Sequence, residues 1–299
     1  EEDLYGRRNR SGVTLCGEES IIKTDHCYDI IKFDTYFNCF SYKKWKKYTC
    51  IENISLMLNL SGKVRVILST LNHIGFDIEE EFVYSEIVES FDKAEFKFKY
   101  PANMDAELLT FHIQPLSDKV SIYGGAYISE INKEIVLPEI NLSIAICSYK
   151  REEYVKNNME LLRKMVFENE NSCLKNHLRV YICDNGKSID PNEFNKDYIK
   201  VVPNKNSGGS GGFSRGAIMA IEDHDYIPTH IILMDDDIQF DASALERTYT
   251  FLQLIKEKYK VNMLGGAMFR TDKRNIQHAA GETHTINGII FNKAGYNMY

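Results

Sequence analysis

The pattern of apolar and polar positions changes in the middle of the chain, at about residue 138. Before this point, short runs alternate apolar with polar residues or combine β-branched with aromatic residues, and turn-forming residues separate the runs. After it, short apolar runs alternate with stretches whose apolar positions recur every three or four residues, as on one face of a helix. The pattern therefore predicts two domains, over residues 1–137 and 138–299.

The first part of the chain is predicted to consist of short β-strands. The runs with strand character lie at 34–38, 54–60, 64–68, 81–84, 94–100 and 120–123. Alternation is clearest over 94–100, which is typical of a strand with one buried face. Ser61-Gly62-Lys63 separates two of the runs and predicts a hairpin turn. Many short strands at this spacing favour an all-β sandwich or jelly roll.

The second part alternates strands with helices. The predicted strands are 142–147, 178–183, 198–202, 231–234 and 260–264. The predicted buried helical faces are formed by Val155, Met159, Leu162 and Val166, by Phe213, Ala217, Ala220 and Ile221, and by Leu245, Tyr249, Leu252 and Ile255. Ser243 and Glu246 have the spacing of a capping box. This order predicts a Rossmann-like α/β domain, with a mostly parallel sheet and helices on both faces.

Composition narrows the classes of function. The chain has 43% hydrophobic and 26% charged residues, as in soluble globular proteins, and its net charge of −7 argues against a nucleic-acid binder. Its apolar runs stay below the ~20 residues of a membrane helix, and its charged N-terminus lacks the apolar core of a signal peptide. The seven cysteines form no CxxC pair, so we expect reduced thiols in a cytoplasmic protein. Because the sequence starts without Met, we expect a processed or trimmed chain.

The stretch Asp235-Asp236-Asp237 carries the strongest chemical signal. It follows the apolar run 231–234, and adjacent unpaired charges are too costly to bury within a strand, so we expect them at its C-terminal end. Alternate residues of an extended segment face the same side, so Asp235 and Asp237 can converge while Asp236 faces elsewhere. Two such carboxylates suit a hard divalent cation that also binds a diphosphate; a solvated acidic turn is the alternative.

A glycine-rich segment, 204–215, lies between a predicted strand and a predicted helix. Four of the five residues 208–212 are glycines, which allows a ligand to approach the main-chain N–H groups closely. The N-terminus of the following helix favours an anion at the same place. The segment is neither a P-loop nor a GxGxxG fingerprint on the first strand. It predicts a phosphate-binding loop, with a flexible linker as the alternative.

Polar residues at the ends of two other strands are further candidates. Asp184 ends the strand 178–183 and can accept a hydrogen bond from a base or a ribose hydroxyl, although an Asx turn or a helix cap has equal weight. Ser148, Tyr149 and Arg151 follow the strand 142–147. They can hydrogen-bond to, stack on and charge-pair with a nucleotide, and a solvated turn explains them equally well.

Three stretches resemble family 2 nucleotide-sugar glycosyltransferases with the GT-A fold, and most closely the galactofuranosyltransferase 2-like group of polymerising galactofuranosyltransferases. They are IAICSYKR at 144–151, NSGGSGGFSR at 206–215 and IILMDDDI at 231–238. The GGSGGF segment followed by MDDDI is the more specific signal, since an acidic triplet alone is typical of any metal-dependent GT-A enzyme. Members of the group also carry an N-terminal β-sandwich domain, and the segment 35–38 with Trp45 is similar to its start.

The resemblance implies a metal-dependent, inverting glycosyltransferase that uses UDP-galactofuranose to extend a cell-surface glycan. Asp235 and Asp237 would hold Mn²⁺ or Mg²⁺ against the diphosphate, and Asp236 would lie near the ribose or the donor sugar. Arg151 and Asp184 would hold the uridine. The donor-binding residues implied are Ser148, Arg151, Asp184, Asn206, Gly208, Gly209, Gly211, Gly212, Asp235 and Asp236.

The catalytic base stays unassigned. In the family, an Asp or Glu deprotonates the acceptor hydroxyl, and this base and a third metal ligand, a histidine, follow the donor-binding half. The segment between Asp237 and Tyr299 contains no late pair of acidic residues of that kind. The resemblance therefore implies a C-terminally truncated chain whose base lies beyond Tyr299.

The expected partners are a UDP-sugar donor and a glycan or glycolipid acceptor, without nucleic acid. We expect the protein in the cytoplasm, free or peripheral to the cytoplasmic face of the inner membrane, and a homo-oligomer stays open. Three other functions also stay open: a transferase of the same fold with another nucleotide sugar, such as a rhamnosyltransferase; a noncatalytic carbohydrate-binding protein that acts through its β-domain; and a nucleotidyltransferase.

Overall fold

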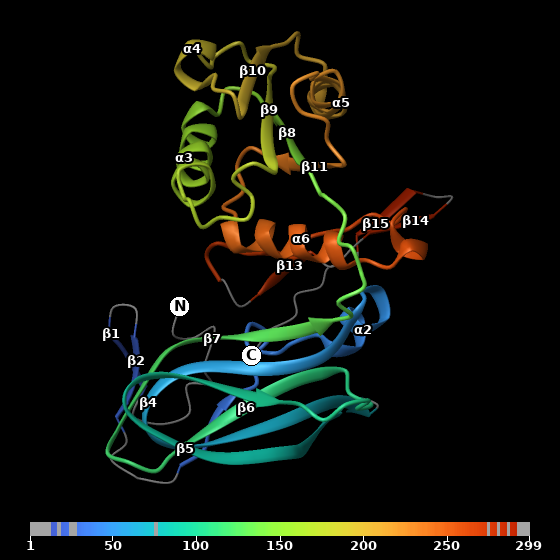
Figure 1. Ribbon diagram of the computed structural model, residues 1–299. Coiled ribbons are helices and arrows are strands. Elements are labelled where there is room, and N and C mark those ends of the chain that lie inside the picture. The colour runs from blue at the N-terminus through green and yellow to red at the C-terminus, as the bar shows by residue number, and fades with distance from the viewer. Residues whose placement is uncertain are drawn as a thin grey trace. The chain divides into compact units, whose positions relative to one another are not determined.

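The structure is a computed structural model that describes residues 13–16, 19–23, 29–74, 77–273, 276–279, 282–285 and 288–291 (Figure 1). The chain divides into two compact units, which we describe separately. One unit comprises Glu1–Ile135 with Lys256–Tyr299, and the other comprises Val136–Ile255. Among the described residues, no helix is long and apolar enough to cross a membrane.

The first unit contains an antiparallel β-sheet built around one long central strand. Its strands are β1 (Val13–Cys16), β2 (Glu19–Lys23), β3 (Ile31–Phe33), β4 (Ile51–Ile74), β5 (Asp77–Lys99), β6 (Leu108–Pro115) and β7 (Lys119–Ile131), and helix α2 (Tyr42–Tyr48) precedes β4. The strand order is β1-β2-β7-β4-β6-β3, and β5 pairs with the other edge of β4. The strands confirm an N-terminal β-domain, while its two-layered sandwich form stays a prediction.

A bulge in β4 explains why two predicted strands form a single strand. The runs 54–60 and 64–68 both lie in β4, and its pairing with β5 shifts register between Leu60 and Gly62. Gly62 has φ +94°, and a side chain there would overlap the carbonyl oxygen of Lys119. The hairpin turn predicted at this position is therefore wrong, because a glycine with positive φ lets the strand continue through a bulge. On either side of the bulge, β4 exchanges β7 for β6 as its neighbour.

Two other predicted strands are also wrong. The segment 34–38 is a turn after β3, in which the backbone N–H groups of Asn38 and Cys39 donate to Thr35 O, each over 3.0 Å. The segment 260–264 contains no strand and follows the 3-10 helix η2 (Glu257–Tyr259). The remaining strands are short and pair as β12 (Met268–Phe269) with β13 (Gln277–Ala279) and β14 (Glu282–Thr285) with β15 (Gly288–Phe291).

The segment that follows residue 255 packs with the first unit. The backbone N–H of Lys256 donates to Tyr48 O over 2.9 Å, and the ring of Phe269 lies 5.6 and 5.4 Å from those of Tyr36 and Phe37. The sequence predicts that this segment continues the second domain. The predicted domains, 1–137 and 138–299, differ from the two compact units in the place of residues 256–299, and their boundaries stay a prediction.

The second unit is built on a four-stranded parallel sheet in the order β10-β9-β8-β11. The strands are β8 (Leu142–Ser148), β9 (Leu178–Asp184), β10 (Ile199–Pro203) and β11 (His230–Asp235). The helices are α3 (Glu152–Leu162), continued by the π-helix η1 (Arg163–Phe167), then α4 (Pro191–Phe194), α5 (Gly208–Ile221) and α6 (Ala242–Leu254). The sheet confirms the parallel α/β arrangement that the alternating pattern predicts.

Helices cover both faces of this sheet, and alternate strand residues show which helix covers which face. Ile144 and Val180 pack in one core with residues of α3 and α6. Ala145, which points to the opposite face, lies against α5 at Gly216. The first predicted helical face is confirmed, since Val155, Met159 and Leu162 of α3 and Val166 of η1 are all buried. The predicted capping box of α6 is wrong: Asp241 caps this helix by accepting from the backbone N–H of Ser243 over 2.9 Å.

A buried carboxylate ties the start of β9 and β10 to the end of α5. Asp223 accepts hydrogen bonds from Arg179 Nη1 (3.1 Å), Tyr181 Oη (2.7 Å) and Lys200 Nζ (2.7 Å). Burial alone would raise the pKa of Asp223, but the bonds from Lys200 and Tyr181 hold it well below its ordinary value of 3.8. A buried charge with this many partners stabilises the fold as long as each partner remains.

Replacement of Asp223 by Ala is expected to lower the free energy of unfolding by about 3 kcal/mol, because two cations and a buried hydroxyl lose their shared acceptor. Urea unfolding of the wild type and Asp223→Ala measures this difference. Asp197→Ala, which removes an exposed aspartate of the same unit, should change the free energy of unfolding by less than about 0.5 kcal/mol.

The low pKa of Asp223 also fixes the sign of a pH effect. A lowered folded-state pKa means that the ionised carboxylate stabilises the fold above pH 3.8 and that this contribution is lost as the pH falls toward the folded-state pKa. The difference in unfolding free energy between the wild type and Asp223→Asn should thus shrink between about pH 4 and pH 2. A difference that stays constant over this range would contradict the assignment.

Candidate functional site

Parallel pairing brings several strand ends of the second unit to one edge of the sheet. Ser148 at the end of β8 is the register partner of Asp184 at the end of β9. On the other side of β8, Asp235 at the end of β11 is the register partner of Cys147. Ligands of open α/β sheets bind at this carboxyl edge, and most of the residues predicted to bind a donor lie along it.

The acidic tripeptide alternates between exposed and buried side chains. Asp235 is the last residue of β11, and Asp236 and Asp237 form the turn after it. Asp236 is 6% exposed, whereas Asp235 and Asp237 are exposed. Asp235 and Asp237 are therefore both accessible to a ligand, and Asp236 is turned into the protein.

Ser148 at the end of β8 and Arg151 at the start of α3 contact the acids of the tripeptide in different ways. Ser148 Oγ donates to Asp236 over 2.8 Å, and both side chains are buried. Arg151, at the N-terminus of α3, places Nη1 3.4 Å from Asp236 Oδ1 and forms a close ion pair with Asp237. The charges of Asp237 and then Asp236 raise the pKa of Arg151. The half-exposed guanidinium thus neutralises a carboxylate that the sequence predicts to be a metal ligand.

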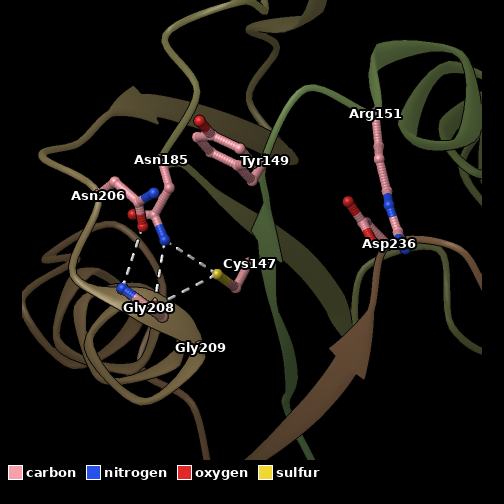
Figure 2. A pocket seen from close by; sticks show the side chains of 8 residues that line it. All are labelled: Cys147, Tyr149, Arg151, Asn185, Asn206, Gly208, Gly209 and Asp236. Atoms are coloured by element: carbon pink, nitrogen blue, oxygen red, sulfur yellow. Dashed lines mark hydrogen bonds and ion pairs between the residues drawn. The ribbon is translucent and has the colours of Figure 1, made fainter.

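A pocket of about 310 Å³ opens at this edge (Figure 2). Its lining residues are Cys147, Tyr149, Arg151, Asn185, Asn206, Gly208, Gly209 and Asp236. Figure 2 shows Asn185, Asn206 and Gly208 on one side, with Arg151 and Asp236 on the other. Five of the predicted donor-binding residues line this pocket: Arg151, Asn206, Gly208, Gly209 and Asp236.

The glycines of the segment 204–215 all lie in the first part of helix α5, and only residues 204–207 form a loop before it. The helix starts at Gly208, which has φ +70° and whose N–H donates to Asn206 Oδ1 over 3.1 Å. Gly212 is buried, and a side chain there would overlap Cys147 Sγ, while a Cβ on Gly216 would lie 3.0 Å from the Cβ of Ala145. These glycines allow α5 to pack directly on the sheet.

The buried face of α5 therefore differs from the predicted one except at Ala220, which is buried as predicted. The helix buries Gly212, Gly216 and Ala220, whereas Ile221 is 66% exposed. The prediction followed the larger apolar residues, but the close approach of the helix to β8 leaves space only for small ones. Gly211 lies outside the pocket and packs against Ser207.

Asp184 has a structural role in the described site. It is fully buried and accepts from the backbone N–H groups of Gly186 (2.9 Å), Ser188 (2.7 Å) and Ile189 (2.8 Å). This is the turn that the sequence offers as the alternative to uridine binding. Asp184 and Ser148 do not line the pocket, so a contact of either residue with a nucleotide stays a prediction.

Two pocket residues, Cys147 and Asn185, are absent from the set predicted from sequence. Asn185 Nδ2 donates to Gly208 O over 3.1 Å and lies 3.3 Å from Cys147 Sγ, while its Oδ1 accepts from Asn204 Nδ2 over 2.9 Å. Burial, followed by the charges of Asp236 and Asp235, raises the pKa of Cys147, which keeps the thiol protonated at neutral pH. Their positions at the ends of β8 and β9 are the only signal that the sequence offers.

The exposed acids at this edge could supply part of the coordination of a divalent cation. In the described part of the chain, no group of three or more His, Cys, Asp or Glu side chains is arranged to hold a metal ion. Two exposed carboxylates, Asp235 and Asp237, remain on consecutive outward positions. Mg²⁺ is commonly bound in this way, by one or two carboxylates together with phosphate oxygens and water.

The parallel sheet, the helix N-terminus and the acidic turn place the second unit in the class of open α/β sheets, whose ligands bind at the carboxyl edge. The family model described as Glycosyl transferase family 2 matches residues 143–296. The chain belongs to glycosyl transferase family 2, and it is a glycosyltransferase whose second unit has the GT-A fold. The model described as Galactofuranosyltransferase 2 N-terminal matches residues 18–130, which makes the protein galactofuranosyltransferase-like.

Comparisons with individual proteins give only distant likenesses. No curated protein matches the chain. A family 29 carbohydrate-binding module from Piromyces equi is 17% identical, with 41% of this chain and 77% of that chain covered and a TM-score of 0.26. The glycosylation-associated Gap123 complex from Streptococcus agalactiae is 9% identical, with 85% and 92% covered and a TM-score of 0.26. Likenesses at this level add nothing to the two family matches.

The packing of α5 on the sheet can be tested at two glycines of the same helix. Gly212→Ala is expected to lower the free energy of unfolding by about 1–3 kcal/mol, because the new methyl group overlaps Cys147. Gly209→Ala has no atom within 4 Å of the added Cβ and should leave stability unchanged or raise it by up to about 1 kcal/mol. Thermal and urea unfolding compare the two; equal effects would refute the packing role of Gly212.

Proposed function

We propose that this glycosyltransferase transfers galactofuranose from UDP-galactofuranose to a growing glycan or glycolipid acceptor, with inversion and with a divalent cation. The observation that supports the donor site best is the pocket at the carboxyl edge, which lies beside Asp236 and the start of α5. Galactofuranose as the sugar is supported by the family match over residues 18–130.

Each wall of the pocket offers groups suited to one part of a sugar nucleotide. Tyr149 is 50% exposed at the pocket and offers a ring face on which a uracil base can stack. Asn206 and the N-terminus of α5 lie on the side that favours phosphate oxygens, because the helix dipole and unpaired backbone N–H groups attract anions there. Arg151 adds a positive charge on the opposite side of the pocket (Figure 2).

Asp235 and Asp237 are the residues that would hold Mn²⁺ or Mg²⁺. A bound divalent cation would stabilise the negative charge that develops on the departing UDP. The chain's own contribution is to orient the diphosphate between the start of α5 and the acidic turn. Asp236 has a different role, since its bond to Ser148 fixes the residue that lies between the two exposed acids.

A different nucleotide sugar, such as a dTDP-sugar, is compatible with the same pocket. Binding measured with a panel of UDP- and dTDP-sugars decides between them. Preference for UDP-galactofuranose supports the proposed donor, and preference for a dTDP-sugar would replace it. Glycan binding that persists in the double variant Asp235→Ala/Asp237→Ala, without any nucleotide binding by the wild type, would favour a noncatalytic carbohydrate-binding protein.

Calorimetric titration of the protein with UDP in the presence of Mn²⁺ tests the proposed site. The wild type should bind, and Asp235→Ala/Asp237→Ala should lose at least about tenfold in affinity, because both carboxylates that face the cation are removed. Asp197→Ala is the matched control, since this exposed aspartate precedes β10 at the opposite end of the strands. Absent binding by the wild type, or equal binding by the double variant, would overturn the proposal.

The ion pair of Arg151 with Asp237 leads to a second prediction. In the absence of UDP, Mn²⁺ must compete with the guanidinium of Arg151 for the carboxylate of Asp237. Arg151→Gln should therefore bind Mn²⁺ about two- to fivefold more tightly than the wild type, which corresponds to the free energy of one half-exposed ion pair. Manganese titration followed by electron paramagnetic resonance measures the free ion. Arg163→Gln, which removes ion pairs to Glu160 and Glu168, is the control. Weaker Mn²⁺ binding by Arg151→Gln would show that Arg151 does not compete with the cation.

A further inference from the structure

Asn158 is a polar residue on the apolar face of α3. The other buried residues of this helix are Val155, Met159 and Leu162, and Asn158 is itself only 7% exposed. An amide buried among apolar side chains is costly unless it forms hydrogen bonds. Its position therefore requires partners of its own.

These partners are the backbone carbonyls on either side of Asp237. Asn158 Nδ2 donates to Asp236 O over 3.1 Å and to Ile238 O over 3.0 Å. Strand β11 ends at Asp235, so these carbonyls lie beyond the hydrogen-bonding ladder of the sheet. The side-chain amide of Asn158 supplies the donors that a neighbouring strand supplies elsewhere.

We infer that Asn158 is a positioning residue for the donor site: it fixes the backbone of the acidic turn so that Asp235 and Asp237 project together. This inference rests on the proposed function. The turn is then held twice, at the side chain of Asp236 by Ser148 and at the main chain by Asn158. Arg151 begins the same helix, so α3 contacts both the side chains and the backbone of the tripeptide.

Rigid placement matters because Asp237 lies beyond the sheet, whereas Asp235 is still held by the pairing of β11 with β8. A carboxylate that ligates a metal loses affinity when the groups that orient it are removed, commonly by about 10–100-fold. Asn158 orients the main chain and touches neither a ligand nor an exposed carboxylate. Its loss should therefore weaken binding at the site without changing any atom that contacts the ligand.

The adjacent asparagine provides a matched control. Asn157 has the same side chain on the same helix but is exposed. Asn158→Ala should bind UDP with Mn²⁺ at least about tenfold more weakly than the wild type, and Asn157→Ala should bind as the wild type does. Equal binding by a folded Asn158→Ala would overturn the inference while leaving the proposed function intact, provided that Asp235→Ala/Asp237→Ala still abolishes binding.

A second variant separates positioning from packing. Asn158→Asp keeps the shape of the side chain but replaces the donating amide by an acceptor that repels both carbonyls at pH 8. A donor role predicts that Asn158→Asp binds no better than Asn158→Ala, whereas a packing role predicts binding close to that of the wild type. Asp223→Asn controls for general destabilisation, because it weakens the same unit without a bond to the turn, and its UDP affinity should stay unchanged. An equal loss in Asp223→Asn would refute the positioning role.

Discussion

Parallel pairing of β8 with both β9 and β11 is the constraint on which the rest of the site depends. It brings the ends of the strands to one edge, where Ser148 can reach Asp236 across the sheet. Parallel strands also require helical crossovers, and two of these helices contribute to the site through their N-termini, α3 with Arg151 and α5 with Gly208. The site thus follows from topology together with a few short polar side chains placed where the strands end.

Close packing of α5 is the second physical requirement. The stripe of Gly212, Gly216 and Ala220 lets the helix approach β8, and Asn185 then reaches Gly208 O from the end of β9. The glycine-rich segment therefore has two roles, since its first residues line the pocket and its later residues pack on the sheet. Phosphate binding by this segment is a proposal that concerns only its first residues.

Much of the second unit could be predicted from sequence, because continuous apolar runs and a period of three to four residues directly reflect burial in a parallel α/β sheet. The exposed-buried-exposed order of Asp235, Asp236 and Asp237 could also be predicted, because successive side chains of an extended segment point to opposite sides. Apart from Ala220, the buried face of α5 could not be predicted, because hydrophobicity does not mark positions occupied by glycine. The sequence predicts a turn at Gly62 because bulges and hairpins use the same residue, and only the tertiary pairing of β4 with β7 and β6 distinguishes them.

The central claim is that two exposed acids at the end of β11 bind a cation together with a sugar nucleotide. A crystal of the protein grown with UDP and Mn²⁺ tests this most directly, through the anomalous scattering of manganese. We predict one strong anomalous peak within about 2.5 Å of carboxylate oxygens of both Asp235 and Asp237 and next to the diphosphate. UDP bound in the pocket with manganese elsewhere, or held by neither carboxylate, would contradict the claim.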